Sequence, residues 1–263
     1  MDLGLSGRPA LVAAASKGLG RASALALAGE GARVAICARD RGELETTRDH
    51  IAEVTGAEVV ALPADVATEE GAVAFVREGS EALGGCQILV ANAGGPPSGE
   101  VSGFSDDDLR QALDLNLLST VRMAREAIPR MRQAGYGRIV VISSSSVKQP
   151  VPGLVLSTTA RAAAAGWARH LADEVAGDGI TVNTVLPGRF DTDRVRWLLG
   201  RRAESEGLSL DEVAKRDAEA IPAGRIGDPD ELGAVVAFLC SGRASYVTGT
   251  FVSVDGGLYR GLL

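Results

Sequence analysis

The sequence is poor in aromatic residues, histidine and cysteine. These low contents argue against an interior filled by aromatic side chains, a metal site and a disulfide framework. Aromatic residues make up 4% of the 263 residues, so aliphatic side chains must fill the interior, since hydrophobic residues make up 46%. The two histidines and three cysteines are isolated from one another, and their spacing matches neither a metal site nor a disulfide framework. We therefore expect no bound metal, and buried free thiols typical of a reducing cytoplasm.

The sequence also lacks an excess of positive charge and any long apolar run. It has 27 basic and 34 acidic side chains, a net charge of −7, which argues against a general nucleic-acid or anionic-membrane surface. No apolar run approaches the roughly 20 residues that a membrane-spanning helix needs. The composition is instead typical of a globular enzyme, so we expect neither nucleic acid nor membrane among its partners.

Short apolar runs alternate with longer helical patterns along the whole chain. The runs are rich in Val, Ile, Leu and Ala, which is typical of strands buried on both faces of a parallel sheet. They span residues 9–14, 34–37, 59–62, 88–91, 139–142, 182–186 and 251–254. The helical stretches include 21–30, 68–83, 106–134 and 160–176. This alternation predicts an α/β fold, a Rossmann-type doubly wound sheet of seven parallel strands with helices on both faces, in a single domain spanning 1–263.

Residues 190–221 interrupt this rhythm between the sixth strand and the last helix. The segment is rich in arginine, with Arg194, Arg196, Arg201 and Arg202 close to Trp197. We interpret it as an inserted helical lid over a substrate, with an excursion that packs in an oligomer as the alternative. The arginines suit an acidic carrier protein or a phosphate, but we favour a solvated charged face.

A glycine-containing loop follows the first predicted strand and opens a helix. It reads Ala13-Ala14-Ala15-Ser16-Lys17-Gly18-Leu19-Gly20. The glycines let the backbone approach a pyrophosphate, and the amides at the helix N-terminus favour an anion. Ala14 lacks the freedom of glycine, at a cost of about 1 kcal/mol or more if the turn needs a positive φ.

The end of the second strand bears on the choice of dinucleotide. An acidic residue about 20 residues after the loop would bind the ribose 2′-hydroxyl of NAD, but Ala38 stands there and Arg39 follows. A small residue beside a guanidinium suits the 2′-phosphate of NADP, and Lys17 adds a second cation. We therefore expect NADP, and Asp40 leaves NAD open as the alternative.

These motifs together resemble the short-chain dehydrogenase/reductase family, and most closely its β-ketoacyl-carrier-protein reductase group. The loop resembles the family's T-G-x-x-x-G-x-G, with alanine at its first two positions. Further matches are Asp65-Val66, Asn92-Ala93-Gly94, Pro187-Gly188 and the C-terminal Val254-Asp255-Gly256-Gly257. The resemblance covers essentially the whole chain. It implies a cofactor site made of Ser16, Lys17, Gly18, Leu19, Gly20, Arg39, Asp65, Val66, Asn92, Ala93, Gly94, Arg161, Pro187, Gly188 and Thr192.

The resemblance fails at the catalytic residues. Asn116 and Ser144 fit the family's Asn and Ser, although neighbouring serines leave the choice of Ser144 open. The family's Y-x-x-x-K pair falls on Ser157 and Arg161. Reduction of a carbonyl needs a proton for the developing alkoxide. Serine is a much weaker acid than tyrosine, and arginine keeps its proton at neutral pH, so the usual proton relay is absent.

Other groups are candidates for the missing proton donor. Water or Ser157 is one possibility, and Lys148 is another if desolvation lowers its pKa. Tyr259 is a third, if oligomerisation places the C-terminal tail at the site. We expect His50 and His170 to be surface residues of helices.

The function that follows is an NADP-linked reductase of a carbonyl substrate, 3-oxoacyl-type or similar and possibly carrier-bound, with altered proton delivery. One alternative is a nucleotide- or partner-binding protein with little catalysis. Another is a non-redox enzyme, because halohydrin dehalogenases resemble this family and carry arginine at the lysine position, although they keep the tyrosine. The resemblance also implies a cytoplasmic homotetramer or homodimer.

Overall fold

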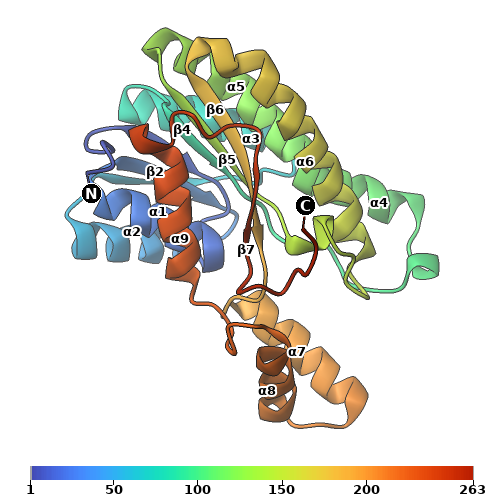
Figure 1. The fold of residues 1–263 in the computed structure, drawn as a ribbon. Helices are drawn as coiled ribbons and strands as arrows, with labels where there is room; N and C mark the ends of the chain where they lie inside the picture. Colours follow the sequence, from blue (N-terminus) through green and yellow to red (C-terminus); the bar gives the residue numbers. More distant parts are fainter. Residues whose placement is uncertain (1, 263) are drawn as a thin grey trace.

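The computed structural model describes residues 2–262, which form a seven-stranded parallel sheet with helices on both faces (Figure 1). Met1 and Leu263, the ends of the predicted domain, lie outside the described residues. The strand order is β3-β2-β1-β4-β5-β6-β7, and every pairing is parallel. The predicted fold class is therefore confirmed. The strands are β1 (Pro9–Val12), β2 (Arg33–Ala38), β3 (Val59–Pro63), β4 (Ile88–Ala91), β5 (Gly137–Ile142), β6 (Ile180–Pro187) and β7 (Phe251–Val254).

The helices divide between the two faces of the sheet. One apolar core packs α3, α5 and α6 against the strands, and a second packs α1, α2 and α9 against the opposite face. The small side chains that dominate both cores fit the low aromatic content. The helices are α1 (Gly18–Gly29), α2 (Arg41–Thr55), α3 (Glu69–Leu83), α4 (Asp106–Leu113), α5 (Ser119–Ala134), α6 (Val155–Val175), α7 (Asp193–Glu206), α8 (Leu210–Ala220) and α9 (Pro229–Cys240).

Two helix predictions differ from the structure in ways that matter for the site. The predicted helix 106–134 is α4 and α5 joined by a π-helical segment, Asp114–Leu118. Helix α6 begins at Val155, ahead of the predicted residue 160, and its N-cap residue Leu154 makes no capping hydrogen bond. Hydrophobic periodicity does not reveal a single wide turn, and a helix start without a capping side chain gives no local signal.

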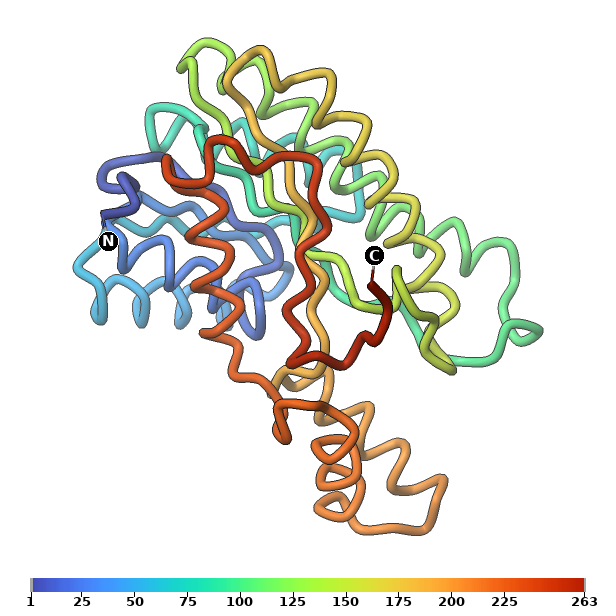
Figure 2. Tube along the Cα trace, in the orientation of Figure 1, coloured from blue at the N-terminus to red at the C-terminus, as the bar shows by residue number. Residues whose placement is uncertain are grey.

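Residues 190–221 are helical, and α7 and α8 project from the carboxyl edge of the sheet, as Figure 1 and Figure 2 both show. The two helices pack on each other through a small apolar cluster of Leu199, Ala203 and Val213. The segment therefore has its own minor core and extends away from the rest of the chain. Its role as a lid stays a prediction.

Among residues 2–262, no helix is long and apolar enough to cross a membrane. No group of three or more His, Cys, Asp or Glu side chains in the same residues is placed to hold a metal ion. The histidines of α2 and α6, His50 and His170, are exposed as expected. The three cysteines are buried and free, as expected.

Candidate functional site

A cavity of about 1160 Å³ lies at the carboxyl ends of the central strands. Ligands of doubly wound sheets bind at this edge, because the strand order reverses there and opens a crevice between the loops. The phosphate loop, the residues after β2 to β6, the start of α6 and the start of α7 line the cavity. Of the predicted site residues, Gly20 and Asn116 are buried and do not line it; all the others do.

The phosphate loop adopts the strained turn that the sequence left open. Ala14 has a φ of 48°, in the region where glycine is favoured. Asn92 Nδ2 donates to the carbonyl oxygens of Ala13 and Ala14, at 3.2 and 3.1 Å, and holds the turn. A Cβ on Gly20 would lie 2.4 Å from the Ala14 oxygen. Gly20 is therefore needed for the close approach of α1 to the loop, without contact to a ligand.

At the end of the cavity near β2, Arg39 differs from Lys17 in having no carboxylate partner among the described residues. Lys17 Nζ is 3.2 Å from Glu43 Oε1. The Asp40 carboxylate caps α2 by accepting a 2.8 Å hydrogen bond from the Glu43 amide. Arg39 is exposed and makes no ion pair within residues 2–262. The Asp40 carboxylate is used as a helix cap, whereas the Arg39 guanidinium has no ion-pair partner among the described residues. This end of the cavity therefore suits a phosphate better than a pair of ribose hydroxyls.

The phosphate loop and the residues after β6 face each other between the two ends of the cavity. Gly18 has a φ of 57°, and a Cβ added to it would lie 3.5 Å from Thr192 Cγ2. The phosphate loop therefore lies close to the Thr192 side chain, which follows β6. The N-terminus of α1 opens onto the cavity, which favours a pyrophosphate.

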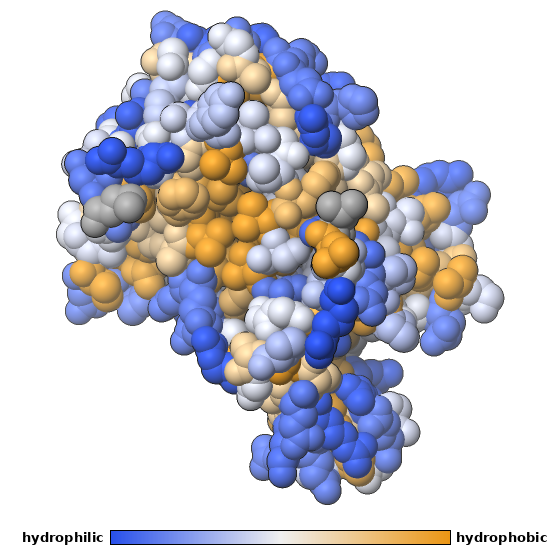
Figure 3. All heavy atoms as spheres, in the orientation of Figure 1, coloured by the Kyte–Doolittle hydropathy of each residue, from blue (hydrophilic) through white to orange (hydrophobic). Residues whose placement is uncertain are grey.

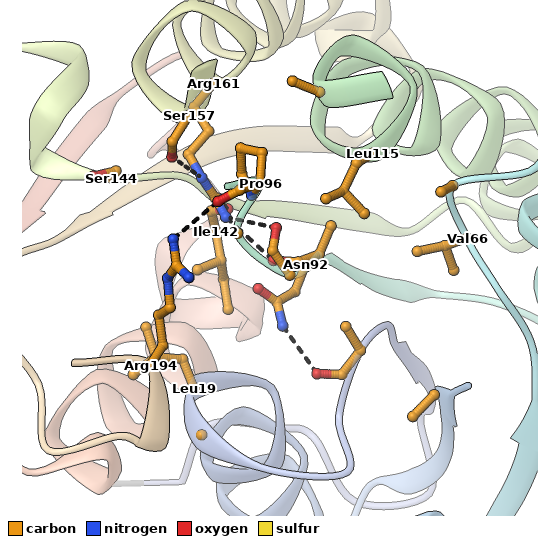
Figure 4. A pocket seen from close by; sticks show the side chains of 18 of the residues that line it. Leu19, Val66, Asn92, Pro96, Leu115, Ile142, Ser144, Ser157, Arg161 and Arg194 are labelled. Atoms are coloured by element: carbon orange, nitrogen blue, oxygen red, sulfur yellow. Dashed lines mark hydrogen bonds between the residues drawn. The ribbon is translucent and has the colours of Figure 1, made fainter. Parts of the chain in front are cut away.

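Arg161 occupies the other end of the cavity, beside Ser157 in Figure 4, and its guanidinium makes five hydrogen bonds to protein groups. Nε donates to Ser157 Oγ at 3.3 Å. Nη1 and Nη2 donate to backbone carbonyls after β5 and β4, namely those of Ile142, Ser143, Ala93 and Gly94. The guanidinium therefore ties α6 to two strand ends, and no N–H is left for a ribose hydroxyl in this arrangement. Burial, assisted by the charge of Arg194, lowers its pKa to about 10, so it stays protonated at neutral pH.

Ser144, Ser157 and Asn116 converge on the same region. Ser144 is partly exposed in the cavity, and its Oγ accepts from the Ser146 amide at 3.1 Å, which leaves its own proton to donate. Ser143 is buried, and its Oγ donates to the Arg161 carbonyl at 3.5 Å. Asn116 lies in the π-helical segment, where Nδ2 donates to the Gly94 carbonyl at 3.0 Å and the buried Oδ1 has no hydrogen-bond partner among residues 2–262. The geometry favours Ser144 among the four consecutive serines.

None of the three tyrosines lines the cavity, and neither does Lys148. Tyr136 Oη donates to the Cys240 carbonyl at 2.7 Å, on another part of the sheet, and Tyr246 is fully exposed. Lys148 Nζ lies 5.0 Å from the centroid of the Tyr259 ring. Of the predicted replacement donors, Lys148 and Tyr259 therefore contact each other and do not line the cavity, whereas Ser157 does.

Sequence reasoning placed Arg194 on the lid but missed it as a residue of the site. It lines the cavity, and its Nη2 donates to the Pro96 carbonyl at 2.9 Å. Gly95 and Pro96 were missed as well, although they directly follow the Asn92-Ala93-Gly94 motif. For Gly95 and Pro96, the available signal was their position directly after a recognised motif. Arg194 was hard to single out because three other arginines lie in the same segment.

Comparisons with known proteins identify relatives over nearly the whole chain. The family model described as enoyl-(acyl carrier protein) reductase matches residues 13–259. A 3-oxoacyl-[acyl-carrier-protein] reductase of Pseudomonas aeruginosa is 35% identical over 257 residues, 98% of this chain and 99% of the relative. L-sorbose reductase of Gluconobacter frateurii, crystallised with NADPH and L-sorbose, has a TM-score of 0.95 and 33% identity over 100% of both chains. Actinorhodin polyketide ketoreductase with NADPH has a TM-score of 0.92 and 31% identity, covering 97% of this chain and 98% of its own.

Proposed function

The chain belongs to the short-chain dehydrogenase/reductase family, and from that premise we propose that it is an NADP-linked oxidoreductase that reduces a carbonyl substrate. The observation that carries this proposal is the single cavity that runs from Arg39 to Ser144, Ser157 and Arg161. The relatives that reduce 3-oxoacyl groups, and the polyketide ketoreductase, support a 3-oxoacyl-type or similar substrate. Such a substrate is free or bound to a carrier.

The preference for NADP is assigned to Arg39. A guanidinium with no carboxylate partner is available for a 2′-phosphate, and neighbours crystallised with NADPH support this choice. Arg39→Ala is expected to weaken NADPH binding about 10- to 100-fold, since hydrogen bonds to charged groups are worth about 1.5–3 kcal/mol. NADH binding should hardly change. Arg41→Ala, which removes an exposed arginine paired with Glu45, is the control.

Bound NADPH supplies a hydride to the carbonyl carbon. The chain then has to orient the carbonyl and deliver a proton to its oxygen. We assign orientation to the hydroxyls of Ser144 and Ser157. Ser157 Oγ accepts from Arg161, so its proton is directed elsewhere, and the adjacent positive charge favours release of that proton to the alkoxide with replacement from water. Arg161 and Asn116 act as positioning residues behind them.

One observation favours a second candidate, a nucleotide- or partner-binding protein with little catalysis. No phenol lines the cavity within residues 2–262, and the donors of Arg161 are taken by four backbone carbonyls and the Ser157 hydroxyl. A chain that keeps the cofactor-binding residues of the family but lacks its tyrosine acid is consistent with a protein that binds a nucleotide or a partner without turning over a substrate.

Two measurements separate these functions: NADPH binding by fluorescence, and turnover on a panel of carbonyl compounds that includes 3-oxoacyl thioesters. The reductase proposal expects wild-type turnover that Ser144→Ala lowers at least 100-fold without weakening NADPH binding, with Ser145→Ala as the control. Binding without turnover, gained only in Ser157→Tyr/Arg161→Lys, would establish the second candidate instead. Absence of NADPH binding would contradict both.

Assembly and location belong to the same proposal. We propose a homotetramer or homodimer, supported by the resemblance to the family. We also propose a cytoplasmic location, supported by three buried thiols that form no disulfide among the described residues.

A further inference from the structure

Helix α7 carries four arginines, and Arg194 differs from the other three. Arg196 pairs with Asp191 at 2.7 Å, Arg201 with Glu204 at 3.7 Å, and Arg202 with Asp217 at 2.7 Å. These three form the solvated charged face expected from the sequence. Within residues 2–262 no carboxylate lies within ion-pair distance of Arg194, and it is the one of the four that lines the cavity.

The guanidinium of Arg194 is held in place and not left free in solvent. Its carbon lies 4.9 Å from the centroid of the Trp197 ring, and Nη2 donates to the Pro96 carbonyl. The other side rests against Gly95, where an added Cβ would lie 3.2 Å from Nε. Only one of its five N–H donors has a described acceptor, so an oriented donor edge remains available.

Arg194 faces the end of the cavity where catalysis was assigned. Figure 4 shows it reaching from α7 toward Pro96, on the side of the pocket where Ser144, Ser157 and Arg161 lie. Arg161 is a second cation there, and it too has no carboxylate partner among the described residues. The nearby cavity carboxylates have their own arginines, since Asp114 pairs with Arg122 and Asp193 lies 3.9 Å from Arg196. Two neighbouring cations in a partly buried pocket favour an anion between or beside them.

We propose that Arg194 binds a carboxylate of the substrate, so that the enzyme acts on an oxo acid whose carboxylate and carbonyl both lie at this end of the cavity. The inference rests on the proposed reductase function. A carboxylate is favoured because its two coplanar oxygens match the edge of a guanidinium in a bidentate pair. The same edge would also accept a phosphate oxygen, from the cofactor or from a phosphorylated substrate, and the test separates these sources.

The chain provides its own reporter for this site. It has two tryptophans, and in the Trp167→Phe background Trp197, which contacts Arg194, is the only one. Its fluorescence is titrated at saturating NADP⁺ with pyruvate and acetoacetate, and with their methyl esters. At least one acid is expected to bind about 10-fold or more tightly than its ester. Equal binding of acid and ester in both pairs would overturn the proposal.

Variants of the helix identify the group responsible. Arg194→Met should remove the preference for the acid, weakening its binding about 10- to 100-fold while ester binding and NADPH binding stay unchanged. Arg194→Lys should restore part of it, since it keeps the charge and loses the fork of donors. Arg196→Met, which removes an exposed and ion-paired arginine from the same helix, is the control. Melting temperatures of all variants establish that they are folded.

The remaining outcomes distinguish the sources of the anion and the two proposals. If Arg194→Met weakens NADPH binding instead, the residue serves a cofactor phosphate and the proposal is wrong. Tighter binding of acetonylphosphonate than of acetoacetate, lost in Arg194→Met, would also overturn it in favour of a phosphate. Turnover of esters and acids alike, unaffected by Arg194→Met, would leave the reductase function standing and remove this inference. Acid binding that depends on Arg194, without turnover of any carbonyl, would overturn the reductase function and with it the action on an oxo acid, and would leave only a carboxylate site at Arg194.

Discussion

At the scale of single residues, Ala14 stores strain in the phosphate loop. Its φ of 48° costs an L-residue about 1 kcal/mol or more, whereas glycine adopts it freely. We expect Ala14→Gly to raise the free energy of unfolding by about 1 kcal/mol, because glycine relieves the strain. The greater conformational entropy that glycine gives to the unfolded chain reduces this gain slightly. Urea denaturation measures the change. Ala15→Gly, at a neighbouring position with negative φ, should destabilise the fold; a destabilising Ala14→Gly would contradict the prediction.

Loss of Arg161 should cost much stability. Its side chain satisfies four carbonyl oxygens and one hydroxyl in a buried region, so Arg161→Met leaves several acceptors without donors. We expect the free energy of unfolding to fall by about 3 kcal/mol or more. Arg169→Met, which removes an exposed arginine of the same helix paired with Asp173, should change it by about 0.5 kcal/mol or less. Similar values for both would show that Arg161 is not a structural clamp.

At the scale of elements, Asp217 joins the two projecting helices to the rest of the chain. It is 9% exposed on α8 and lies 2.7 Å from Arg202 of α7 and 3.2 Å from Arg189, which follows β6. Asp217→Asn leaves both arginines without this carboxylate, so the docking of α7 and α8 should loosen. Trypsin cleavage within 190–221 should become several-fold faster. Glu219→Gln, on the exposed face of α8, is the control, and equal cleavage rates would refute the role given to Asp217.

At the scale of the whole molecule, burial of three thiols makes stability depend on alkaline pH. Burial raises the pKa of Cys37, Cys86 and Cys240 from the ordinary value near 9 to about 12. Between these pH values the unfolded chain has lost thiol protons that the folded chain keeps, so stability falls as the pH rises. Each thiol contributes up to about 1.4 kcal/mol per pH unit above 9. Urea unfolding from pH 8 to 10.5 should show this slope, and replacement of all three by alanine should flatten it.

The outer face of α9 and β7 should be the assembly surface. Phe238 on α9 is 41% exposed and Phe251 on β7 is 38% exposed, and Figure 3 shows an apolar patch over these elements. β7 is also an edge strand, which a second copy can cover. Phe238→Glu should therefore shift the sedimentation of the protein toward the monomer. Val54→Glu, at an exposed position of α2, should not; a wild-type monomer would contradict the expectation.

The amino-acid sequence was enough to predict the parallel sheet and the loops after its strands that line the cavity. Buried strands and their helices leave local patterns of hydrophobicity, and the residues of a parallel sheet that bind ligands follow strand ends, so their places can be read in order along the chain. The family resemblance revealed that Ser157 and Arg161 stand in place of the family's tyrosine and lysine, because their distance from a shared motif at 179–183 identifies the two positions.

The contacts of those two side chains and their neighbours could not be predicted from the sequence, because they form between distant segments of the folded chain. Which acceptors take the five N–H groups of Arg161 depends on the ends of β4 and β5, far from it in the sequence. The π-helical turn around Asn116, and the selection of Arg194 from four similar arginines, likewise depend on packing. Local sequence specifies conformation, but the partners of a charged group are set by segments that meet only in the folded chain.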